Sequence, residues 1–202
     1  MTHYLRAGGL LSAQPPAGPA QPSRYRYGPA YPTRGLGGAT DRGGGAKDNR
    51  RLDARPDVLT FTSDPVRAET TIMGTVTVRL HARSSLDHTD FFARLCDVSP
   101  KGASKNVRDG IIRLDRGGTR EMTITLSPTA HCCLRGHRIR LQISSGAHPM
   151  YSRNPGTGEP LVTATAMRAA DQEILQEAAH ASAVVLPVVT PAQGRQPSPP
   201  GS

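Results

Sequence analysis

The densest group of potential metal ligands or nucleophiles is His131-Cys132-Cys133 with His137, four side chains within seven residues. Thiolates and imidazoles at this density raise the possibility of zinc. Structural zinc sites, however, pair their ligands as C-x(2–4)-C with a distant second pair, and adjacent cysteines on a strand point to opposite faces. The pattern therefore favours a buried thiol beside a strand, and we expect no metal and no cofactor.

A nucleophilic serine of the α/β-hydrolase type stands in G-x-S-x-G, where small flanking residues permit a sharp strand-to-helix turn. No serine in this chain has glycine at both two-residue offsets, and no alternating β-α order is visible. Asp87, His88 and Asp90 resemble an acid–base cluster, but turn polarity explains them better, because Asp accepts local backbone hydrogen bonds. We therefore expect no catalytic residue within the chain.

One loop has a composition suited to recognition. Residues 144–154 (SSGAHPMYSRN) follow a strong strand signal and mix small residues with aromatic and charged ones. Loops at the ends of sandwiches often carry recognition. Tyr151, Arg153 and Asn154 are candidate contacts with another domain, and an ordinary surface loop is the alternative.

The elements that would position these side chains are strands. Apolar residues alternate at period two in 75–82 (TVTVRLHA), 121–126 (EMTITL) and 138–143 (RIRLQI). The segment 91–98 is apolar on both parities, which predicts a central strand covered on both faces. Further strands are expected at 111–114 and 183–189, where Pro187 suits an edge or a strand end. Residues 169–179 have a helix-like composition but also fit a strand, with Gln172, Ile174 and Gln176 on one face.

Turn clusters separate these segments and no long helical pattern occurs, so we predict an all-β fold: a jelly-roll, galactose-binding-like β-sandwich over residues 57–190. Residues 1–56 are rich in Pro, Gly and Arg, and we predict an irregular leader there. Residues 191–202 are predicted to be a disordered tail.

The formal net charge of +9 invites a nucleic-acid hypothesis. The basic residues are dispersed along the chain, and we expect no nucleic-acid partner. The run Arg24-Tyr25-Arg26-Tyr27 has the composition of a base-stacking platform, but these tyrosines more simply pin an extended segment onto the sandwich. An odd cysteine count implies no disulfide framework, and no apolar run suits a signal peptide or a membrane span. We expect a cytoplasmic protein without a membrane partner.

Several segments, in order and spacing, resemble the C-terminal domain of cocaine-esterase-like and X-prolyl dipeptidyl peptidase serine hydrolases. They are 57–65 (DVLTFTSDP), 89–98 (TDFFARLCDV), 106–112 (NVRDGII), 128–131 (PTAH), 136–141 (GHRIRL), 153–155 (RNP) and 158–159 (GE). The likeness is strong over residues 57–190, and the leader resembles the family's linker. Cys132-Cys133 depart from the pattern, because the family has larger apolar residues there.

The resemblance implies a jelly roll packed on an α/β-hydrolase domain that supplies serine, aspartate and histidine for cleaving esters, amides or X-Pro peptides. None of those three residues maps onto this chain. The resemblance thus implies an accessory domain, from a truncated gene, a pseudogene or a split subunit, with the catalytic domain as its partner in cis or in trans. The alternative is a free-standing ligand- or carbohydrate-binding module. The chain has no Trp and only three Phe, which leaves few aromatic side chains for a binding platform.

Overall fold

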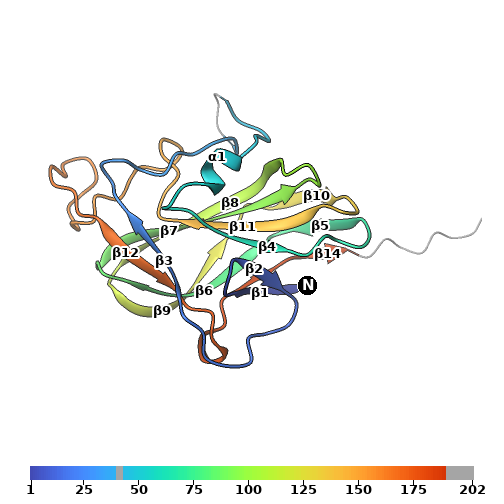
Figure 1. Ribbon diagram of the computed structural model, residues 1–202. Coiled ribbons are helices and arrows are strands. Elements are labelled where there is room, and N and C mark those ends of the chain that lie inside the picture. The colour runs from blue at the N-terminus through green and yellow to red at the C-terminus, as the bar shows by residue number, and fades with distance from the viewer. Residues whose placement is uncertain (40–42, 190–202) are drawn as a thin grey trace, which may run out of the picture.

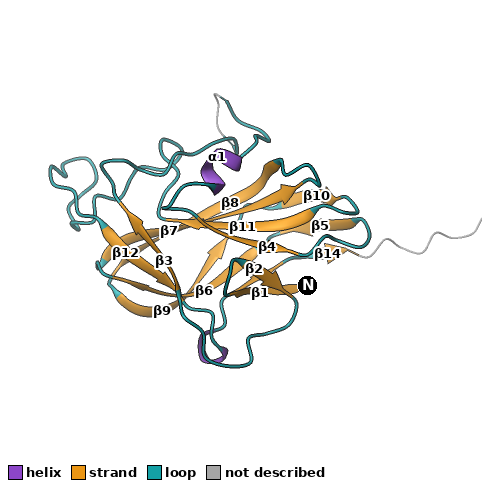
Figure 2. Ribbon diagram, in the orientation of Figure 1, coloured by secondary structure: helices purple, strands orange, loops and turns teal. Residues whose placement is uncertain are grey.

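Strands account for nearly all regular structure in the computed structural model, which describes residues 1–39 and 43–189 (Figures 1 and 2). The strands are β1 Thr2–Arg6, β2 Leu10–Ser12, β3 Ser23–Tyr27, β4 Leu59–Ser63, β5 Thr70–Gly74, β6 Thr77–Ser84, β7 His88–Val98, β8 Ser104–Asp115, β9 Gly118–Thr125, β10 Thr129–Cys133, β11 Arg138–Ser144, β12 Ala170–Ile174, β13 Ala183–Val185 and β14 Val188–Val189. One helical turn, α1 (Arg50–Asp53), and one 3₁₀ turn, Ala178–His180, accompany them. No helix in these ranges is long and apolar enough to span a bilayer.

The strands form a β-sandwich, as predicted. The larger sheet has the order β3-β12-β6-β13-β1-β2-β4-β11-β7-β8, with β9 paired to β6, and the smaller sheet is β10-β5-β14. Among the strands named above, every pair is antiparallel except the short β2–β4 pair. Because β13 belongs to the large sheet and β14 to the small one, the Pro187 region carries the chain from one sheet to the other.

The core follows from the period-two pattern. Val78, Leu80 and Ala82 of β6 are buried, and Ile139, Leu141 and Ile143 of β11 join the same cluster. In β6 the intervening Arg79 points outward and is exposed, whereas in β11 the intervening Arg140 is half-buried and Gln142 is buried. Alternation therefore predicted both the strands and the faces that they bury.

Strand β7 is covered on both faces, which confirms the prediction for its doubly apolar run. All residues from 89 to 96 are buried. One face of β7 contributes Phe91 and Leu95 to the core. The other lies beneath the chain that precedes β4, and Figure 1 shows α1 and the segment before it above β7, β8 and β11.

The prediction of an irregular leader over residues 1–56 is wrong. Strand β1 lies between β13 and β2 in the large sheet, and β3 pairs with β12. Leu5, Tyr25 and Tyr27 are buried in the core, so the two tyrosines pin this segment as expected. The Gly and Pro content masked short alternating runs, because strands of three to five residues carry little periodic signal.

The ambiguous segment 169–179 resolves into β12 followed by the 3₁₀ turn. Gln172, Ile174 and Gln176 are all buried, which confirms their common face. The tail predicted at 191–202 lies outside the described residues.

Candidate functional site

Two histidines contact one aspartate at the cluster that was considered from the sequence, and rejected, as a zinc site. Asp97 lies on β7, His131 on β10 and His137 in the turn before β11. His131 Nε2 is 2.9 Å from Asp97 Oδ2, and His137 Nδ1 is 2.7 Å from Asp97 Oδ1. Cys133 Sγ lies 3.8 Å from the same Oδ1. This cluster joins the small sheet to the large one.

The chemistry of this cluster is structural. Cys132 is exposed and Cys133 is buried, so the adjacent thiols point to opposite faces as predicted. Burial, with the Asp97 carboxylate nearby, raises the pKa of Cys133 to about 12, which keeps this thiol protonated and a weak ligand or nucleophile. No three His, Cys, Asp or Glu side chains in the described ranges are grouped to hold a metal ion.

The cluster of Asp87, His88 and Asp90 does not act as one unit, because its two carboxylates make different structural contacts. Asp87 accepts the backbone N–H of Gly117 at 2.7 Å and is a turn residue, as expected. Asp90 was also assigned to a turn, and this was wrong. It lies on β7, 1% exposed, and binds the Arg113 guanidinium through two contacts of 2.8 and 2.7 Å.

The candidate interdomain residues occupy different depths. The Tyr151 ring is half-buried and packs edge-on against Phe92, with centroids 6.0 Å apart. Arg153 is exposed, and its Nη1 lies 3.4 Å from the Pro29 carbonyl oxygen. Asn154 is 5% exposed and donates to Asp90 at 2.8 Å. Asn154 therefore holds the loop in place, whereas Tyr151 and Arg153 remain at the surface.

A second segment runs beside this loop. The Gly35 N–H donates to the His148 carbonyl at 2.8 Å, and the His148 N–H donates to the Thr33 carbonyl at 2.9 Å. A Cβ at Gly35 would meet the Ala147 carbonyl oxygen at 2.7 Å, so glycine is needed for this approach. Two segments more than a hundred residues apart in sequence thus form one surface.

A buried arginine supports this surface from below. Arg94 on β7 is 1% exposed and donates to the Leu36 carbonyl at 2.8 Å and to Asn49 Oδ1 at 2.9 Å. Its Nη2 lies 2.9 Å from Asp109 Oδ2, which compensates the buried charge. This network ties the segment around Leu36 and Asn49 to the outer face of β7 and β8.

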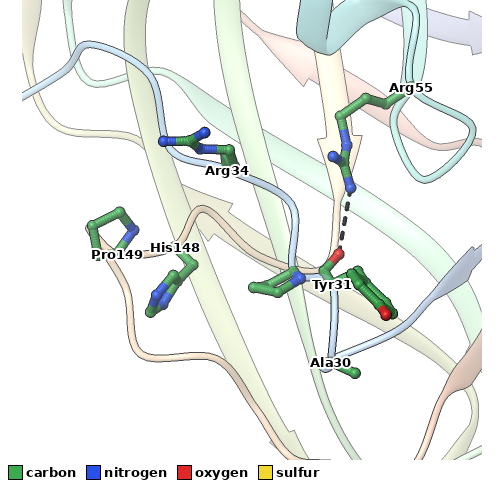
Figure 3. Close-up of a pocket in the computed structure, with 7 residues that line it drawn as sticks. Ala30, Tyr31, Arg34, Arg55, His148 and Pro149 are labelled. Atoms are coloured by element: carbon green, nitrogen blue, oxygen red, sulfur yellow. Dashed lines mark hydrogen bonds between the residues drawn. The ribbon is translucent and has the colours of Figure 1, made fainter.

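An open depression of about 510 Å³ lies where the two segments meet (Figure 3). In Figure 3, Arg34 lies near His148 and Pro149 on one side, and Arg55 and Tyr31 lie on the other. Arg55 is held by two contacts to Asp57, Nε–Oδ1 at 2.7 Å and Nη2–Oδ2 at 2.8 Å. The side chain of Tyr31 is directed away from the core, and this residue is 86% exposed.

This arrangement is suited to recognition. It offers cations, an aromatic ring and backbone groups on a fixed base, and the depression is not lined by a serine, cysteine or carboxylate. Tyr151 and Arg153, which were proposed from the sequence, do not line this depression. Tyr31, Arg34 and His148 line it and were not proposed. The sequence signal that could have indicated this site is the pair of Tyr31 and Arg34 within a Gly/Pro-rich stretch.

Comparisons with known proteins agree with the sandwich. Residues 2–185 match the family model described as the X-Pro dipeptidyl-peptidase C-terminal non-catalytic domain. The chain is 33% identical over 199 residues to cocaine esterase of Rhodococcus sp. (strain MB1 Bresler), covering 90% of this chain and 34% of that protein. It is 26% identical over 173 residues to a putative serine esterase of Mycobacterium bovis, covering 71% of this chain and 26% of the relative.

Solved structures show the same relationship. An α-amino acid ester hydrolase superposes with a TM-score of 0.85 at 30% identity, over 93% of this chain and 36% of its own. An aminopeptidase from a marine-sediment Thaumarchaeota archaeon shares the fold, with a TM-score of 0.85 at 24% identity over 94% of this chain and 36% of its own. The chain thus spans about a third or less of the length of these proteins.

Proposed function

Because the chain belongs to the family of X-Pro dipeptidyl-peptidase C-terminal non-catalytic domains, we propose that it acts as the accessory β-sandwich of a serine hydrolase. In this role it packs against an α/β-hydrolase catalytic domain and steadies it. The catalytic domain is supplied either in the same polypeptide or by a separate chain. The hydrolase cleaves esters, amides or X-Pro peptides.

The match of residues 2–185 to a non-catalytic domain is the observation that carries this proposal. Two relatives are named as esterases, and the chain covers only 34% and 26% of their lengths. Most of the length of each relative therefore lies outside the matched segment, and the residues that carry its activity can lie there. The arrangement of Asp97 and Asp90, each engaged in structural contacts, fits an accessory role.

The alternative function is a free-standing ligand- or carbohydrate-binding module, and its carbohydrate-binding form finds less support. Such modules present several aromatic rings on one face for stacking. This chain has five Tyr and three Phe, and Tyr31 is the one that lies fully exposed at the surface. Tyr25, Tyr27 and the three Phe residues are buried.

The test uses the polypeptide encoded directly upstream of this chain, whether in the same reading frame or a separate one. We expect it to contain G-x-S-x-G followed by Asp and His, and to co-purify with the 202-residue chain when the two are co-expressed. The complex should hydrolyse p-nitrophenyl esters or X-Pro anilides, and replacing the partner's G-x-S-x-G serine by alanine should abolish turnover. Labelling of the 202-residue chain alone by a serine-directed probe, or an upstream polypeptide that does not bind, contradicts the proposal.

A further inference from the structure

We propose that the catalytic domain binds a specific surface of the sandwich, formed by residues 30–36 and 147–153 with Leu161 at its edge. We call this surface the docking face. The inference rests on the proposed function and adds to it the location of the contact and the chemistry of the partner surface. Tyr31 is its central anchor.

Exposed apolar side chains are gathered along the docking face. Tyr31 is 86% exposed, Leu36 36% and Leu161 41%. Single exposed apolar residues are common on soluble proteins, but two of these line depressions that are built on one loop. The depression of Figure 3 is lined by Tyr31, His148 and Pro149, and a second depression of about 320 Å³ is lined by Tyr151, Ser152 and Leu161. Exposed apolar area with a polar rim is typical of an interaction site.

The docking face is built on a fixed support, although it consists of loops. The hydrogen bonds between Gly35, His148 and Thr33 join its two segments. Buried Arg94 holds the Leu36 carbonyl, and buried Asn154 holds the other loop onto Asp90. Loops ordered before binding lose less conformational entropy in the complex, so preorganisation favours tight association.

The charge of the docking face specifies its partner. Arg34 and Arg153 form no ion pair within the described residues, whereas Arg55 shares its charge with Asp57. A second copy of this chain would bring like charges together across a two-fold interface, which disfavours self-association. A partner surface with carboxylates around an apolar centre would satisfy both features.

The outer surface of β3, β6 and β12 has a different character. Its charges pair with one another: Arg83 lies 3.1 Å from Glu173, Arg24 lies 2.8 Å from the same carboxylate, and Arg26 lies 2.7 Å from Asp171. Cross-strand pairs of this kind are already compensated in the free protein. That face therefore fits contact with water.

The occupant we assign is the α/β-hydrolase domain. The chain spans 34% of the cocaine esterase and 36% of the ester hydrolase, so about two thirds of each lies outside the matched segment. A part of that size needs a substantial contact with the sandwich to stay in one orientation, because inter-domain contacts that bury little area leave the domains mobile. The docking face combines exposed apolar area, fixed geometry and uncompensated charge.

The decisive experiment compares matched variants of the full chain in complex with the upstream polypeptide of the preceding section. Tyr31→Glu places a negative charge at the centre of the docking face, where it would repel the carboxylates of the partner surface. Leu134→Glu is the control, because Leu134 is also apolar and 48% exposed but lies in the turn between β10 and β11, at the far end of the sandwich from residues 28–39 (Figure 1). We expect Kd to rise at least about tenfold for Y31E and to stay within about twofold for L134E.

Hydrogen–deuterium exchange on the wild-type complex locates the contact independently. Protection of residues 30–36 and 147–153 supports the inference. Circular dichroism and urea midpoints confirm that Y31E is folded, and Arg34→Glu replaces it if it is not. If the complex forms but protection falls on β6 and β9, or if Y31E binds as the wild type does, the docking face is wrong while the proposed function stands. If the wild-type chain forms no complex, both are overturned.

Discussion

Arg94 Nη2 lies 2.9 Å from Asp109 Oδ2, and both side chains are buried where Leu36 and Asn49 approach β7. A charge placed in this environment is stable only with its partner, because removing one member leaves the other desolvated and uncompensated. The pair therefore does more than bridge β7 and β8. Arg94 also fixes the backbone at Leu36, where the first segment of the docking face ends.

The Arg94 pair gives the first prediction. Arg94→Met should lower the free energy of unfolding by about 3–5 kcal/mol, since it leaves Asp109 buried without a cation. The double variant R94M/D109N, which removes both charges, should recover part of this loss. Urea denaturation of the three proteins measures it. A loss below about 1 kcal/mol for R94M contradicts the role assigned to the pair.

A second prediction concerns acid stability. Burial favours a higher pKa for Asp97, but hydrogen bonds from His131 and His137 outweigh burial and hold its pKa below the ordinary value. A carboxyl with a lowered folded pKa contributes stability that is present above about pH 4 and is lost as the pH falls through the folded pKa.

Asp97→Asn removes this contribution, so its unfolding free energy should change less between pH 6 and pH 3 than that of the wild type. Glu121→Gln is the control, because the Glu121 side chain is 57% exposed and lies 3.9 Å from Arg79. Urea titrations across this pH range make the comparison. An unchanged slope in D97N shows that the two histidines do not stabilise the charged carboxylate.

Local periodicity predicted much of the fold. Alternation in β6, β9 and β11 needs no knowledge of the partner strand, because it reflects which face meets water. The doubly apolar run of β7 even indicated a second covering layer. The identity of that layer depended on Arg94 meeting Asn49, a pairing across 45 residues for which sequence carries no local signal.

The same limit applies to the candidate site. Tyr151 and Arg153 were proposed as interdomain contacts because their loop follows a strong strand and mixes residue types. Tyr31 and Arg34 gained their importance only when Thr33 and Gly35 paired with His148. Because Tyr31 and Arg34 stand in a Pro/Gly-rich stretch, the sequence predicted coil there. The backbone pairing that brings them to the loop of His148 is long-range and has no local sequence signal.

The N-terminal strands supply a third prediction. A chain beginning at residue 57, the boundary expected from sequence, should fail to fold cooperatively, because β1 lies in the interior of the large sheet between β13 and β2. A milder variant in the full chain tests the same point. Leu5→Ala, at a fully buried position, should cost about 2–5 kcal/mol.

Leu10→Ala is the matched control, because Leu10 is 58% exposed on the neighbouring strand and should cost less than about 0.5 kcal/mol. Thermal and urea unfolding of both variants measure the difference. Equal stabilities for L5A and L10A would show that β1 is peripheral to the core.

A fourth prediction concerns the thiols. Cys132 is exposed, whereas burial raises the pKa of Cys96 and of Cys133 to about 12 in each case. A thiol-disulfide reagent at pH 8 should therefore modify one cysteine in the native protein and all three after denaturation. Cys132→Ser should remove the native reaction. Rapid labelling of native C132S would show that Cys96 on β7 or Cys133 on β10 is accessible, which contradicts their burial.

The last prediction separates backbone strain from crowding in the chain that follows Leu36 of the docking face. Gly37 and Gly43 both have φ of +71°, where an L-residue costs about 1 kcal/mol. A Cβ at Gly43 would have no atom of the described residues within 4 Å, but at Gly37 it would lie 2.5 Å from the Gly45 carbonyl oxygen and 2.6 Å from Asn106 Oδ1. Gly37→Ala should therefore cost roughly 2 kcal/mol more than Gly43→Ala in urea unfolding, and it should also weaken binding of the upstream polypeptide by displacing Leu36. Equal costs would mean that this segment moves aside freely, and a docking face built on it would lack the fixed geometry that favours tight association.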